Sequence, residues 1–153
     1  MLKLSHVLAA ALSAATIAGS LVVVASASGT QSAAVAARGY DLVSFFAKGS
    51  APAVGNARFA VVHAGKRYHF VSQANADAFK ANPLAYPPRY GGYCAWAASE
   101  GYIAPGDPKY ATVVKGKLYF NYDAGVLATW SKDIPGHIVK ADRNWPKLAK
   151  RAG

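Results

Sequence analysis

The stretch RFAVVHAGKRYHFVSQANADAFKA, residues 58–81, decides how this chain folds. It holds two short β-forming runs, Phe59–Val62 and Tyr68–Val71, which are joined by a glycine-containing turn, as is typical of a β-hairpin. Ser72 follows the second run and is a preferred N-cap residue, so a helix with Phe79 on its inner face is expected over the rest of the stretch. The stretch therefore predicts a hairpin followed directly by a helix.

The same order of features returns 51 residues later. Thr112–Val114 and Leu118–Tyr122 flank a Lys-Gly turn, and Asp123 takes the capping place of Ser72 ahead of a helix that carries Trp130. A constant offset is the mark of an internal repeat. A duplication and two independent units with similar turn chemistry both account for the pattern.

Two further helices complete the predicted elements. A short one is expected over Tyr40–Lys48, and a final amphipathic helix is expected from Asp133 onward, with Pro146 shortening or kinking it. Short hairpins that alternate with short helices indicate an α+β domain. We expect a small domain of two β-hairpin/helix units plus a C-terminal helix.

The N-terminus has the pattern of a secretory signal peptide. Lys3 provides a positive start, Leu8–Val24 is apolar and uncharged, and Ala25-Ser26-Ala27 offers small residues for cleavage. Residues 1–27 are therefore predicted to be a signal peptide that directs the chain to the periplasm or the outside of the cell. A retained anchor is the alternative, and no stable membrane insertion is expected after cleavage.

Composition changes sharply along the chain. Residues 28–37 are rich in Ser, Gln and Ala and are expected to form a flexible lead-in to a domain over residues 38–153. Every Trp, Tyr and Phe lies at or after Tyr40. The 17 Lys and Arg residues against 7 Asp and Glu give a formal charge of +10, but they are scattered, so no nucleic-acid partner is expected in an exported protein.

Cys94 is the single cysteine, so no intrachain disulfide forms. The sequence Gly91-Gly92-Tyr93-Cys94 precedes an alanine-rich stretch, which places Cys94 in the first turn of a predicted helix. Free amides at such a position stabilise a thiolate. A buried, inert thiol packed against aromatic residues is the structural alternative.

His69 is the second candidate site residue. Alternation along the strand places it opposite Tyr68 and Phe70, and the repeat alignment matches it with Phe120, so a half-buried position is expected. The sequence contains no CxxC or HxxxH pattern, and a metal site would have to be assembled from distant segments, with Cys94 and His69 as ligands. A hydrogen-bonded core histidine is the alternative.

Five motifs in order give the chain a resemblance to a known family. They are Gly39–Asp41, Tyr68–Ser72, Tyr90–Cys94, Asp133–Gly136 and Ala141–Pro146. Together they resemble the YHS domain family, and most of all its exported single-domain bacterial members. The resemblance implies a metal-binding module, and some exported members carry selenocysteine at the position that matches Cys94.

Three functions remain open on this basis. The leading hypothesis is an exported module that binds copper or zinc through Cys94 and His69. The second is a thiol-based redox protein, in which Cys94 is the catalytic nucleophile and a small external thiol is its partner; whether the chain is an enzyme stays open. The third is a non-catalytic module that binds a protein of the cell envelope.

Overall fold

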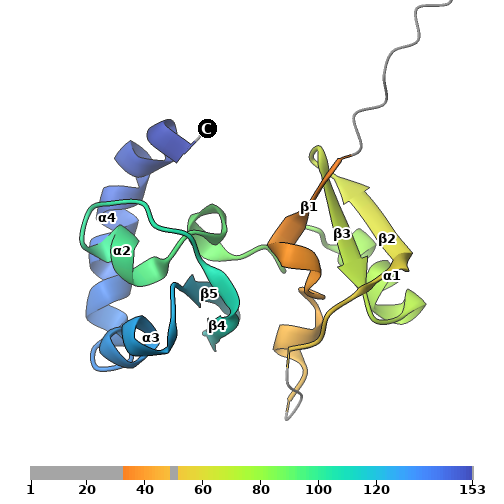
Figure 1. Ribbon diagram of the computed structural model, residues 1–153, viewed down its shortest axis with the longest axis horizontal. Helices are drawn as coiled ribbons and strands as arrows, with labels where there is room; N and C mark the ends of the chain where they lie inside the picture. The colour runs from red at the N-terminus through yellow and green to blue at the C-terminus, as the bar shows by residue number, and fades with distance from the viewer. Residues whose placement is uncertain (1–32, 49–51, 153) are drawn as a thin grey trace, which may run out of the picture. The chain divides into compact units, whose positions relative to one another are not determined.

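The computed structural model describes residues 33–48 and 52–152, all of which belong to one compact unit, Ser32–Gly153. The predicted signal peptide lies outside the described residues, as do residues 28–32. The fold is a mixed α+β domain with a C-terminal helix, as expected (Figure 1). Its elements are β1 (Ala34–Val35), η1 (Ala36–Gly39), η2 (Ser44–Phe46), β2 (Asn56–His63), β3 (Lys66–Phe70), α1 (Gln73–Ala81), η3 (Arg89–Gly92), α2 (Ala95–Ser99), β4 (Asp107–Val114), β5 (Lys117–Asn121), α3 (Ala124–Trp130) and α4 (Ile134–Ala152).

The first hairpin and its helix are confirmed. β2 and β3 pair antiparallel, and α1 follows them. The Ser72 hydroxyl accepts the backbone N–H of Asn75 at 3.1 Å, which satisfies one of the free donors at the start of α1. Phe79 is completely buried and stacks on Tyr68 and Phe70, so α1 covers one face of the hairpin.

The sequence did not predict β1. Ala34 and Val35 pair in parallel with Lys66 and Arg67, so the three-stranded sheet has the order β1-β3-β2. The flexible lead-in expected over residues 28–37 is therefore corrected for its described part, because the fold begins before Arg38. A strand of two residues is too short to show any periodicity, and its partner lies far along the chain.

The second hairpin and its helix repeat this arrangement. β4 and β5 pair antiparallel, and the Asp123 carboxylate accepts the backbone N–H of Val126 at 2.8 Å to cap α3. Trp130 is completely buried, as is Phe79 at the equivalent place on α1. The prediction of two hairpin/helix units is confirmed. We call residues 36–81 the first repeat and residues 89–130 the second repeat.

The two hairpins also share an irregularity. The register shifts between Asn56 and Ala60 in the first repeat and between Asp107 and Ala111 in the second, at the same 51-residue offset. In each, the leading side chain accepts the backbone N–H two residues further on, at 2.8 Å from Asn56 and 2.9 Å from Asp107. A hairpin does not require such a bulge. The shared bulge therefore favours duplication of one unit over chance similarity.

Each repeat starts with a turn of left-handed backbone. Three consecutive residues have positive φ in each turn: Ala37, Arg38 and Gly39 in η1, and Tyr90, Gly91 and Gly92 in η3. Non-glycine residues rarely adopt this conformation, so the shared turn is a specific structural device. It directs the chain into an isolated bridge in both repeats, formed by Tyr40 with Val54 and by Tyr93 with Pro105.

The helix expected over Tyr40–Lys48 is wrong, because only the single 3-10 turn η2 forms there. The backbone N–H groups of Val43 and Ser44 both point to the Asp41 carboxylate, at 2.8 and 3.3 Å. An Asp side chain that takes these amides favours a turn over a regular helix.

α4 packs along α2 and explains two of the motifs. The Asp133 carboxylate accepts the backbone N–H of Gly136 at 3.0 Å at the start of α4, and the Asn144 amide donates to two carbonyls at the end of α2, those of Ala98 and Ser99, both at 3.0 Å. Pro146 lies inside α4 and does not end it. These motifs therefore hold the C-terminal helix in place.

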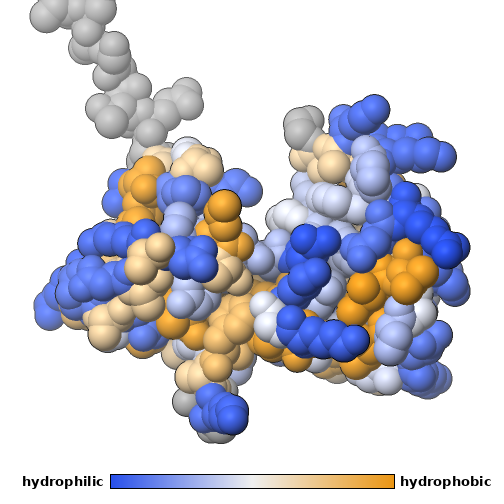
Figure 2. All heavy atoms as spheres, turned by 180° about the vertical axis from the view of Figure 1, so that it is seen from behind, coloured by the Kyte–Doolittle hydropathy of each residue, from blue (hydrophilic) through white to orange (hydrophobic). Residues whose placement is uncertain are grey.

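No helix in residues 33–48 and 52–152 is long and apolar enough to cross a membrane. Hydrophilic side chains cover most of the face seen in Figure 2, with smaller hydrophobic areas between them.

Candidate functional site

Cys94 lies at the N-cap of α2, immediately after the left-handed turn of η3. Its Sγ accepts the backbone N–H of Ala97 at 3.5 Å, and its own N–H donates to the carbonyl of Ala104 at 2.9 Å. Only 1% of the residue is exposed. The prediction that Cys94 stands at a helix start is confirmed, and its side chain is buried there. The Ala97 amide thus gives the sulfur a hydrogen-bond donor.

Asn121 is the residue beside Cys94 that the sequence interpretation missed. Its Oδ1 lies 3.8 Å from the Cys94 Sγ, which donates to it, and also accepts the backbone N–H of Trp96 at 3.3 Å. Asn121 is fully buried, and its Nδ2 has no hydrogen-bond partner among the described residues. A fully buried amide with an unsatisfied donor is costly. A signal was present, because Asn121 interrupts the apolar run of β5.

The first repeat places Asp41 where the second repeat places Cys94. Both residues follow a Gly-Tyr pair that leaves the left-handed turn, and both accept an N–H three residues further on, from Ser44 and Ala97 respectively. Asp41 is fully buried. Besides the two amides of η2, its carboxylate accepts the Val71 N–H at 2.9 Å and the side-chain amide of Asn75 at 2.7 Å. The shared backbone therefore accommodates a buried hydrogen-bond acceptor at this place in both repeats.

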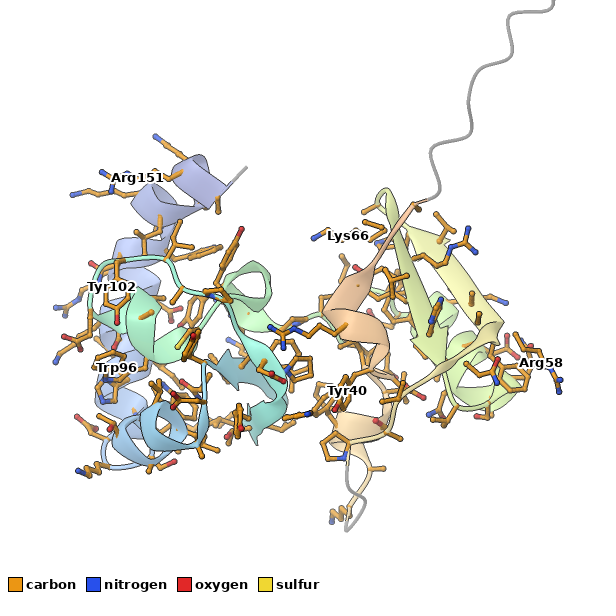
Figure 3. The ribbon with its side chains drawn as sticks, in the orientation of Figure 1. Tyr40, Arg58, Lys66, Trp96, Tyr102 and Arg151 are labelled. Carbon is orange, nitrogen blue, oxygen red and sulfur yellow. The ribbon has the colours of Figure 1, made fainter. Side chains whose placement is uncertain are left out.

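Aromatic residues lie close to the Cys94 site. Trp96 and Tyr102, both labelled in Figure 3, pack edge to face with ring centroids 6.2 Å apart. The pKa of the Tyr102 hydroxyl is raised, first by desolvation and then by the charges of Cys94 and Glu100. The hydroxyl of Tyr102 therefore stays protonated at neutral pH and can donate a hydrogen bond.

His69 lies on β3 in the first repeat and is half-buried, as the alignment with Phe120 predicts. A Cβ added to Gly39 would lie 3.9 Å from His69 Nδ1, and one added to Gly92 would lie 3.8 Å from the Phe120 ring, so the two side chains occupy equivalent places. His69 Nε2 is buried and has no partner within the described part of the chain. The alternative of a hydrogen-bonded core histidine is therefore not confirmed.

No hydrogen bond joins His69 to Cys94, because the sulfur contacts only Asn121 and Ala97 in this way. Over residues 33–48 and 52–152, no group of three or more His, Cys, Asp or Glu side chains is placed to hold a metal ion. A site that used Cys94 and His69 would thus need further ligands of another kind, such as a backbone carbonyl or a ligand from outside the chain.

A second polar cluster forms where α4 meets the end of α2. His137 Nδ1 lies 2.9 Å from Ser99 Oγ and 3.9 Å from a carboxylate oxygen of Glu100. Ser99 Oγ donates to the Trp96 carbonyl at 2.6 Å, so its proton is directed away from the imidazole. A serine nucleophile must instead give its proton to the histidine. The cluster therefore connects α4 to the end of α2.

Comparisons with protein-family models, curated proteins and solved structures find no match to this chain. The resemblance to the YHS domain family remains a prediction from the five motifs. The geometry itself defines the candidate site as a buried thiol at a helix N-cap, with Asn121 beside it.

Proposed function

We propose that this protein is a thiol-based redox protein and that Cys94 is its nucleophile. The observation that supports it is the contact of Cys94 Sγ with the Ala97 N–H, at a place where the first repeat holds the carboxylate of Asp41. A backbone place that holds a carboxylate in one repeat is a suitable place for a nucleophilic sulfur in the other. The resemblance to selenocysteine-containing proteins agrees with this, because selenium also serves as a redox-active nucleophile.

The reaction follows from the single cysteine. The Cys94 thiolate attacks one oxygen of a peroxide, the O–O bond breaks, and the departing oxygen takes a proton, so that the sulfur becomes a sulfenic acid and the peroxide becomes an alcohol or water. An external thiol then forms a mixed disulfide with Cys94 and releases water. A second external thiol attacks that disulfide and restores the Cys94 thiol, because the chain has no other cysteine to resolve it.

Trapping of the sulfenic acid tests this proposal. The protein is treated with hydrogen peroxide in the presence of dimedone, and the mass increase is located by peptide mass spectrometry. We expect labelling of Cys94 in the native protein and none in Cys94→Ser. Since the sulfur is 1% exposed, the rate should rise when local opening is promoted by low denaturant. If only the fully unfolded chain is labelled, Cys94 is a packed thiol and the proposal fails. The non-catalytic binding module then becomes the better hypothesis.

Transition-metal binding is the second candidate, and His69 supports it. The buried Nε2 of His69 lacks a partner among the described residues, and a neutral imidazole nitrogen is a good ligand for copper or zinc. We propose that Cys94 and His69 each contribute to uptake of copper or zinc. His69→Phe is the matched variant, because Phe120 fills the equivalent place in the second repeat. Metal content per chain should fall in His69→Phe and in Cys94→Ala, and equal content in all three proteins would contradict the idea.

We also propose that the chain acts in the periplasm or outside the cell, where a small thiol or an envelope protein is its partner. The support is the N-terminal pattern that ends at Ala27. N-terminal sequencing of the protein isolated from cells should begin at Ser28, whereas a retained N-terminus would favour the membrane anchor.

A further inference from the structure

A cavity of about 310 Å³ opens between the two repeats. Small-molecule pockets in proteins begin at about 300 Å³. Its walls come from β1, η1, Leu42 and β3 on one side and from Pro87, Pro88, the two glycines of η3, Gly106, Pro108 and Phe120 on the other. Neither Cys94 nor Asn121 lines it. The cavity is therefore separate from the residues on which the proposed function rests.

Most of the cavity wall is apolar, and each of its polar side chains can donate a hydrogen bond. Fifteen residues line it, and the only polar side chains among them are those of Arg38, Lys66 and Tyr68. All three are hydrogen-bond donors, and the wall carries no carboxylate or carboxamide. An apolar wall that carries two cationic side chains and a hydroxyl, but no carboxylate or carboxamide, is complementary to an apolar molecule that ends in an anionic acceptor.

Two of the three donors have no partner among the residues that the structure describes. Within residues 33–48 and 52–152, neither the Lys66 ammonium nor the Tyr68 hydroxyl has a hydrogen-bond or ion-pair partner, whereas Arg38 Nη1 pairs with Asp107 at 2.6 Å. Figure 3 shows the Lys66 side chain extending from the start of β3. Burial raises the pKa of the Tyr68 hydroxyl, so it remains a donor at neutral pH.

We propose that this cavity binds a small amphiphilic carboxylate, with the carboxylate on Lys66 and Tyr68 and the apolar part against Leu42 and Phe120. The volume corresponds to about ten water molecules at about 30 Å³ each. That matches an aliphatic or aromatic acid of about ten non-hydrogen atoms. Binding here joins the two repeats, because the ligand contacts both.

Three probes of equal length test the proposal. Octanoate, octanol and octylamine have the same apolar chain and differ only in the charge of the head group. Each is titrated into the isotopically labelled full-length protein, and amide shifts are followed by NMR. We expect octanoate to bind most tightly, octanol about tenfold more weakly and octylamine not measurably, because only the acid complements the donors. The largest shifts should map to residues 34–42, 91–92 and 106.

Matched variants separate this site from unspecific binding. Lys66→Gln should weaken octanoate about tenfold and leave octanol unchanged, since one charge-assisted contact is lost. Lys117→Gln removes the same charge at the equivalent hairpin position of the second repeat and should change neither affinity. Val35→Trp places a large side chain in the wall and should abolish binding of both probes.

Three results would overturn the assignment. The first is octylamine binding as tightly as octanoate, the second is an equal effect of the two Lys→Gln variants, and the third is no binding of any probe to the folded protein. Octanoate binding should be the same in Cys94→Ala, so failure of the redox proposal would not be mistaken for failure of this one.

Discussion

Asp41→Ala is the change that most directly tests the structural equivalence of Asp41 and Cys94. Asp41 has no exposed surface, and its carboxylate accepts four N–H groups. Alanine leaves these donors without their acceptor at a place where the carboxylate itself is completely buried. If the left-handed turn depends on the buried acceptor that follows it, this substitution should lower the free energy of unfolding more than most others in the first repeat.

The magnitude follows from the individual contacts. The N–H groups of Val43 and Val71 lie 2.8 and 2.9 Å from the carboxylate and belong to fixed backbone, so each loses a full charge-assisted bond. The Ser44 contact is longer, at 3.3 Å, and the half-buried Asn75 amide can turn toward water. Counting the first two at about 2 kcal/mol each gives a loss of about 4 kcal/mol in the free energy of unfolding.

Urea denaturation and thermal melting measure the effect. A loss of about 4 kcal/mol lowers the midpoint of a domain of this size by about 15 °C. Asp41→Asn keeps one oxygen and should lose about half as much free energy. Asp77→Ala is the matched control, because that carboxylate is exposed on α1, and its melting temperature should not change. A loss below about 1 kcal/mol for Asp41→Ala would refute the reasoning, since the four contacts would then contribute little to stability.

Three further predictions concern packing, capping and pH. A Cβ on Gly106 would overlap the carbonyl oxygen of Gly92 and lie 2.8 Å from the Cβ of Phe120. Gly106→Ala should therefore lower the free energy of unfolding, measured by urea denaturation, by about 3 kcal/mol or more. Gly125→Ala, where the nearest atom would be 3.4 Å away, should be neutral or slightly stabilising in the same assay. Asp133→Ala removes the cap of α4 and should cost about 1 kcal/mol by the same measurement, with an unchanged stability arguing against the cap. Desolvation raises the pKa of the Tyr90 hydroxyl, and its hydrogen bond to the Asp142 carboxylate raises it further. At a pH at which this hydroxyl is ionised in the unfolded chain, it is therefore still protonated in the folded protein. The contribution of Tyr90 to the free energy of unfolding should therefore be constant below about pH 10 and fall as the pH rises further, and a flat stability profile between about pH 10 and pH 11 would contradict this.

Local features were predictable because their causes lie within a few residues. The turn glycines, the alternating strands and the caps at Ser72 and Asp123 all act over one or two turns of chain, and the structure confirms them. The buried positions of Phe79 and Trp130 followed from the same periodicity. The repeat alignment placed His69 at the position of Phe120, and the structure has both side chains beside the last glycine of the left-handed turn, with Phe120 buried and His69 half-buried.

Contacts between distant segments were not predictable in this way. The contact of Asn121 with Cys94 joins β5 to the start of α2, and the contact of His137 with Ser99 joins α4 to its end. Neither pair shares a local pattern, so only the packing of the helices and strands brings them together. The helix expected over Tyr40–Lys48 failed for a related reason, because the Asp41 side chain competes for its amides.

The sequence by itself determined the two hairpin/helix units, the single thiol and the place of that thiol at a helix start, because spacing and capping chemistry act locally. Tertiary structure alone decided that Cys94 is buried beside Asn121, that no hydrogen bond joins it to His69, and that a cavity lined with donors opens between the repeats. These depend on how the left-handed turns of η1 and η3 direct the chain and on which faces then pack together. Such long-range packing leaves no periodic trace in the sequence.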